Sequence, residues 1–112
     1  MKLLQLAFFM CVSSGAYAQF PNPSQEFVKS KDSPEIAMCT AASLQMQTSI
    51  TLYSTWFDIL KQRYTVIYPQ KTAKQVEAYT IERVLDKKRR LKDMGYDSKS
   101  AALKYFQVNC TP

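Results

Sequence analysis

The stretch that decides the fold is residues 33–64, SPEIAMCTAASLQMQTSITLYSTWFDILKQRY. Ser33 is a favoured N-cap residue, Pro34 suits the first helical position, and Glu35 complements the positive end of a helix dipole. The spacing of the apolar residues that follow is helical and heptad-like, and predicts one long helix of about 28 residues. This row consists of Ile36, Cys39, Met46, Ile50, Tyr53, Phe57, Leu60 and Tyr64.

The second half of this predicted helix is apolar over a wider surface, because Leu52, Trp56 and Ile59 lie beside the row. A wide apolar stripe implies neighbours on more than one side, so we expect this helix to be central in the fold. The run VIYP at 66–69 is β-branched and ends in proline, which predicts that the helix ends near Tyr64.

Two shorter helices follow. Thr72 and Gln75 have the spacing of a capping box, and Gly95 is a natural stop after the second helix. Residues 97–98 supply an N-cap for a third helix that runs up to Cys110. The residues expected on the buried side of the second helix are Val76, Ile81, Val84, Leu85, Leu91 and Met94.

The beginning of the chain has the pattern of an export signal. A short positive start precedes an apolar run at 3–12, and Ala16-Tyr17-Ala18 fits a small-x-small cleavage site. We therefore expect a cleaved signal peptide over 1–18 and a periplasmic or secreted product. Residues 19–32 contain two prolines and several polar residues, which predicts a flexible N-terminal lead before a helical domain at 33–112.

The mature chain keeps two cysteines, Cys39 and Cys110, which predict one disulfide in an exported protein. Closing a loop of this length stabilises a fold by roughly 4 kcal/mol. A regular up-down-up bundle would carry Cys110 away from Cys39, beyond the reach of a disulfide. The fold class expected is therefore all-α: a small, irregular three-helix domain with one long central helix and its C-terminus bonded beside the first turns of that helix.

The composition argues against an enzyme. There is no histidine and there are only two glycines, so the usual general base, the usual transition-metal ligand and Gly-rich phosphate loops are missing. Glu82 and Asp86 form the best carboxylate pair, but basic residues surround them. We expect no catalytic residue, no metal and no cofactor.

Charge is polarised along the chain. Residues 61–104 carry a net charge of +7, and residues 19–60 a net charge of −2. The basic run at 87–92 favours an acidic partner, which could be an acidic protein surface, anionic lipid headgroups or nucleic acid. Nucleic acid is the poorest fit, because an exported protein seldom meets it. Alternatively, the basic run binds no partner and is simply the solvated end of a helix, where it forms the ion pairs Asp86–Arg90 and Arg89–Asp93. The candidate partner-binding cations are Lys87, Arg89, Arg90 and Lys92.

A second candidate surface lies on the first helix, where residues 36–57 carry no charge. Its polar positions are Gln47, Thr48, Thr51, Ser54 and Thr55, too many hydroxyls and amides for a stable membrane insertion. This face is either a partner-binding surface or the seat of the third helix and the N-terminal lead. Exposed tyrosines make good binding anchors, and the candidates are Tyr64, Tyr68 and Tyr96.

These observations favour a small periplasmic binding protein that inhibits or neutralises a partner protein, such as a delivered hydrolase. Two other interpretations remain: a structural or accessory component of a cell-envelope assembly, and a periplasmic chaperone.

Overall fold

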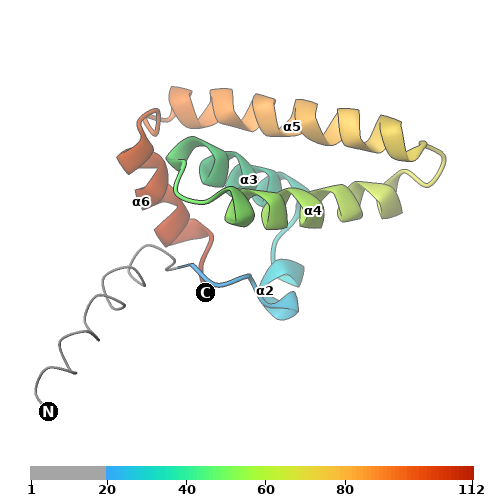
Figure 1. Cartoon of the computed structure of the whole chain (residues 1–112), viewed down its shortest axis with the longest axis horizontal. Helices are drawn as coiled ribbons and strands as arrows, with labels where there is room; N and C mark the ends of the chain where they lie inside the picture. The colour runs from blue at the N-terminus through green and yellow to red at the C-terminus, as the bar shows by residue number, and fades with distance from the viewer. Residues whose placement is uncertain (1–19) are drawn as a thin grey trace, which may run out of the picture.

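The computed structural model describes residues 20–112, and within them the fold is entirely helical (Figure 1). The predicted signal peptide over 1–18 lies outside the described residues. The helices between Phe20 and Pro112 are α2 (Gln25–Lys29), α3 (Ser33–Met46), α4 (Ile50–Ile67), α5 (Ala73–Asp93) and α6 (Lys99–Asn109). None of them is both long and apolar enough to cross a membrane.

The central element is α3, which packs against α4, α5 and α6. It begins one residue earlier than the sequence indicated, because Asp32 is the N-cap and Ser33 the first helical residue. The Asp32 carboxylate accepts the Glu35 main-chain N–H at 2.9 Å, and the Glu35 carboxylate accepts the Asp32 N–H at 2.8 Å. This reciprocal capping box explains why Asp32 takes the N-cap position in place of Ser33.

The prediction of one long central helix is wrong, because the chain reverses between α3 and α4. Gln47 adopts a left-handed conformation with φ of 54°, and Ser49 caps the new helix by accepting the Leu52 N–H at 3.1 Å. The Thr40 hydroxyl lies 2.8 Å from the Ile36 carbonyl and 3.3 Å from the Trp56 carbonyl, across the pair. The uncharged first half of the predicted helix is thus buried among three neighbours, whereas residues 47–51 are exposed.

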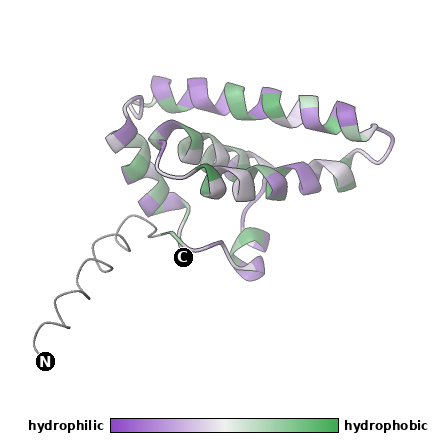
Figure 2. Ribbon diagram, in the orientation of Figure 1, coloured by the Kyte–Doolittle hydropathy of each residue, from purple (hydrophilic) through white to green (hydrophobic). Residues whose placement is uncertain are grey.

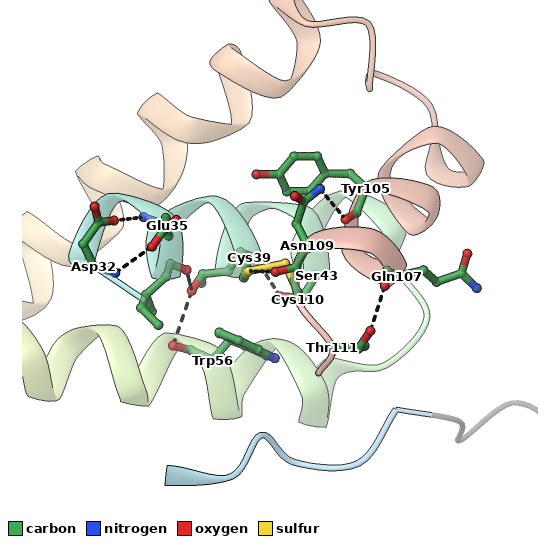
Figure 3. The surroundings of a disulfide bond; sticks show 12 residues. Asp32, Glu35, Cys39, Ser43, Trp56, Tyr105, Gln107, Asn109, Cys110 and Thr111 are labelled. Carbon is green, nitrogen blue, oxygen red and sulfur yellow. Dashed lines mark hydrogen bonds between the residues drawn. A yellow bond between two sulfur atoms is a disulfide. The ribbon is translucent and has the colours of Figure 1, made fainter. Parts of the chain in front are cut away.

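The predicted disulfide is confirmed, with the Cys39 and Cys110 Cα atoms 5.6 Å apart. Figure 3 shows the bond joining the end of α6 to α3, with Trp56 of α4 nearby. Phe106 packs edge-on against the Trp56 ring, with their centroids 5.9 Å apart. The C-terminus is therefore bonded beside the early turns of α3, and the core closes around this point.

The boundaries of the later helices largely follow the predicted caps. Thr72 and Gln75 form the expected capping box of α5, and Gly95 has φ of 95° just after it. Ser98 caps α6 by accepting the Ala101 N–H. The end of α4 is the exception: it continues past Tyr64 to Ile67, with Tyr68 as its C-cap.

Residues 20–32, most of the predicted lead, contain the short helix α2 and pack against the body through Phe20, Phe27 and Val28. Phe20 meets the Phe106 ring edge-on at 4.9 Å, and the Arg63 guanidinium donates to the Val28 carbonyl at 2.7 Å. Figure 1 shows α2 beside α4, on the side away from α5.

Candidate functional site

The buried side of α5 is narrower than its apolar pattern suggested. Ile81, Leu85 and Met94 were expected in the core, but they are 44%, 45% and 47% exposed. The core contains a threonine, Thr80, which was not among the apolar residues expected there. Thr80 is fully buried, and its hydroxyl donates to the Val76 carbonyl at 2.7 Å. The residues of α5 that face the core are Val76, Thr80, Val84 and Leu91.

The exposed side of α5 carries a basic and apolar surface that we call the α5 stripe. At about 100° of rotation per residue, its seven members fall within about 100° of the helix circumference. All seven are exposed and none is acidic. The nearest acids, Glu77 and Glu82, each lie about 20° beyond an edge of this arc, and Asp86 and Asp93 lie farther round the helix. The α5 stripe consists of Lys74, Ala78, Ile81, Leu85, Lys88, Arg89 and Lys92.

The apolar members of the α5 stripe lie between its cations. Lys74 is near the beginning of α5 and three cations are near its end, while Ile81 and Leu85 occupy the middle. Figure 2 shows α5 mostly hydrophilic over its last turns and with hydrophobic residues in its middle, counting both its buried and its exposed side chains. An apolar centre with a polar rim is the usual anatomy of a protein–protein interface.

A hollow of about 360 Å³ lies at the C-terminal half of the α5 stripe. One wall comes from outside α5, where the Gln45 side chain at the end of α3 donates to the main-chain carbonyl of Asp97. Three cations and one acid therefore surround a partly apolar hollow. Its lining is Gln45, Leu85, Lys88, Arg89, Lys92 and Asp97.

The structure divides the four candidate cations between two sides of α5. Arg89 and Lys92 belong to the α5 stripe. The Lys87 side chain is only 22% exposed, and its ammonium lies 3.8 Å from the Asp86 carboxylate. Arg90 lies near Tyr105 of α6, where its charge opposes the rise that burial causes in the pKa of that phenol.

The ion pairs also differ from the expected i,i+4 pairs. Among the described residues, Asp86 lies within 3.4 Å of Arg89 and 3.8 Å of both Arg83 and Lys87. One carboxylate thus offsets part of the charge on three neighbouring cations. Because these pairs are partly exposed, each contributes less than about 1 kcal/mol to stability.

Tyr64 is not an exposed anchor, contrary to expectation, since only 5% of its surface is exposed. Its ring meets Tyr79 of α5 edge-on, with centroids 4.8 Å apart, and burial raises the pKa of its phenol to about 12. Tyr68 is half-buried beside the same rings, and its hydroxyl lies 3.4 Å from that of Tyr79. The Lys71 ammonium lies 5.3 Å and 5.4 Å from the Tyr68 and Tyr79 centroids. These four residues, the tyrosine cluster, hold α4 to α5.

Tyr96 has a similar packing role in the turn between α5 and α6. It is half-buried, its ring lies edge-on to Tyr105 at 5.1 Å, and its main-chain N–H donates to the Leu91 carbonyl at 2.8 Å. Both half-buried tyrosines therefore have structural contacts, and the exposed surface of α5 becomes the stronger candidate for binding.

Another hollow, of about 580 Å³, lies between α2 and α4 and is lined mainly by aliphatic side chains with Asp58, Gln62 and Arg63. Its two opposite charges give no consistent indication of what would occupy it. No group of three or more metal-ligating side chains occurs between residues 20 and 112.

Comparison with protein-family models, with curated proteins and with solved structures finds no match. The candidate site therefore depends on the geometry of α5 itself. Sequence reasoning missed Ile81, Leu85 and Lys88 as surface residues, although a 100° projection of residues 73–93 separates them from the core row. Gln45 and Asp97 carry no such signal, because only the tertiary fold brings them to α5.

Proposed function

We propose that this chain is an exported small helical binding protein that uses the α5 stripe to dock on an acidic partner protein and neutralise it, as an inhibitor of a delivered hydrolase would. The observation that carries the proposal is the acid-free α5 stripe, in which two large aliphatic side chains stand exposed between cations.

Both parts of the α5 stripe have a physical role in such binding. The excess positive charge over 61–104 accelerates encounter with an acidic surface, and this effect weakens as salt increases. Ile81 and Leu85 supply apolar area that becomes buried only in the complex. Export is supported by the signal-like residues 1–18 and by the buried disulfide, a bond that persists mainly in oxidising compartments.

The test begins with capture of a periplasmic partner on the immobilised mature protein and its identification by mass spectrometry. Association rates with that purified partner are then measured at low and high salt. A triple variant, Lys88→Glu, Arg89→Glu and Lys92→Glu, is expected to slow association at least tenfold at low salt, with a smaller effect at high salt.

The matched control is Lys29→Glu, Lys99→Glu and Lys104→Glu, which changes net charge equally at exposed positions outside the α5 stripe. It should retain most of the association rate. Equal slowing by both variants would show that only net charge matters, and the absence of any captured partner would contradict the proposed function.

A further inference from the structure

We propose that the partner presents an acidic amphipathic helix, which lies along α5 with apolar side chains on Ile81 and Leu85 and with a carboxylate in the hollow beside Leu85. This inference rests on the proposed function and specifies the element that the α5 stripe recognises.

The length and shape of the α5 stripe favour a helix. From Lys74 to Lys92 it extends about 27 Å along the axis of one continuous helix. A second helix can follow such a surface over this whole distance and place side chains against it at i, i+4 spacing. A peptide that binds as an added β-strand would need the edge of a sheet for its main-chain hydrogen bonds, and residues 20–112 form no strand.

The order of side chains specifies the pattern of that helix. The apolar pair, Ile81 and Leu85, has i,i+4 spacing and calls for leucine, isoleucine or methionine opposite it. Lys74 on one side and Lys88 and Lys92 on the other call for acids toward both ends of the partner helix. Like charges at these positions would be repelled, which excludes basic amphipathic helices.

The hollow suits the side chain of a glutamate. Leu85 provides an apolar surface for its methylene groups, while Lys88 and Lys92 provide cations that carry no ion pair within the described residues. Arg89 already lies 3.4 Å from Asp86, so we assign it the weaker role. Asp97 is the single acid among the lining residues, and three cations outnumber it.

The probe is a 20-residue helical peptide with leucines at i and i+4 in its centre and glutamates toward both ends of the same face. Its control has the same composition, with the leucines and glutamates moved to opposite faces. Binding to the mature protein is measured by fluorescence anisotropy at low salt, and the contact surface by amide NMR shifts. The patterned peptide is expected to bind at least tenfold more tightly than the control, with shifts concentrated on α5.

Variants identify the contacts. Lys88→Glu with Lys92→Glu should weaken the patterned peptide at least tenfold, and Leu85→Ala should weaken it several-fold. Lys99→Glu with Lys104→Glu should change little, since those side chains are exposed on α6. Because all of these positions are exposed, the variants are expected to fold, and circular dichroism checks this.

Equal binding of the two peptides, or shifts away from α5, would overturn the inference. The proposed function would survive that result if association with the captured partner still depended on Lys88, Arg89 and Lys92. Vesicles of phosphatidylglycerol test the other class of acidic surface: binding to vesicles but to neither peptide would overturn the helix inference in favour of a lipid surface.

Discussion

The two ends of the helical bundle are stabilised in different ways. Where α6 meets α3, the Cys39–Cys110 bond and the buried Phe106 and Trp56 rings hold the elements together. Where α4 meets α5 near residues 68–72, the contacts come from the tyrosine cluster. The first end depends on a cross-link and on apolar burial. The second depends on phenols and a cation, so its stability varies more with pH and salt.

Of the contacts at the two ends, the disulfide is expected to contribute most to the free energy of unfolding. Replacing Cys39 and Cys110 together by alanine is expected to lower the free energy of unfolding by about 4 kcal/mol, because the unfolded chain regains the entropy of a long loop. Urea denaturation measures the loss, and hydrogen exchange should show α6 opening before α5. Unchanged stability would show that the contacts of Phe106 alone hold this end.

The packing of Tyr64 against Tyr79, at the opposite end, is expected to have the second largest effect on stability. Tyr64→Ala should cost about 3 kcal/mol, because it leaves a cavity against Tyr79. Tyr64→Phe keeps the ring and should cost less than about 1 kcal/mol. Thermal unfolding of the two variants separates ring packing from the hydroxyl; similar losses in both would contradict this assignment.

Alkaline pH should destabilise the fold, and Tyr64 of the tyrosine cluster should account for part of the loss. Burial raises the pKa of Tyr64 to about 12, above its ordinary value of 10.0, so the unfolded chain loses this proton first as pH rises. The corresponding stability is complete below pH 10 and is lost as pH increases from 10 toward 12. Urea denaturation at pH 9 and pH 11 should show a smaller decrease for Tyr64→Phe than for the natural chain, and equal decreases would refute the attribution to Tyr64.

The smallest expected effect concerns the turn that leads α6 back to the disulfide. Gly95 has φ of 95°, and no atom beyond its immediate neighbours lies within 4 Å of where a Cβ would be. Gly95→Ala should therefore cost about 1 kcal/mol through backbone strain alone. Thermal unfolding measures it, with the exposed Ser100→Ala as control; a loss above about 3 kcal/mol would indicate a steric clash instead.

Local signals predicted most of the caps, and the pair of cysteines predicted the disulfide, but the break in the first helix was not predicted. Thr72, Gly95 and Ser98 act through contacts with nearby residues, so the sequence order alone reveals them. The reversal at Gln47 is different, because the apolar spacing continues on both sides of it and looks like one helix. Only the hydroxyls of Thr48 and Ser49 indicated a break in the helix at this point, since such side chains favour caps over helix interiors.

The α5 stripe was only partly predictable for the same reason. The run of cations identified Arg89 and Lys92, but hydrophobicity alone placed Ile81 and Leu85 in the core and left out Thr80, although the helical projection does the reverse. A threonine becomes a good core residue when its hydroxyl bonds to its own helix, as that of Thr80 does with Val76. Tyr64 belongs to the apolar row, but the helix was expected to end near it, which suggested exposure. Because α4 continues to Ile67, Tyr64 stays within the helix and packs against Tyr79.

The bond between Cys39 and Cys110 also determines how the molecule carries mechanical load. Tension applied between residue 20 and residue 112 passes through sulfur, so it stretches only the segments outside the covalent ring. The ring encloses the second part of α3 and all of α4, α5 and α6, and it is bypassed by the force, which leaves α5 folded while the termini are pulled. A single proteolytic cut at residues 47–49 or 68–72 would likewise leave the two pieces covalently joined.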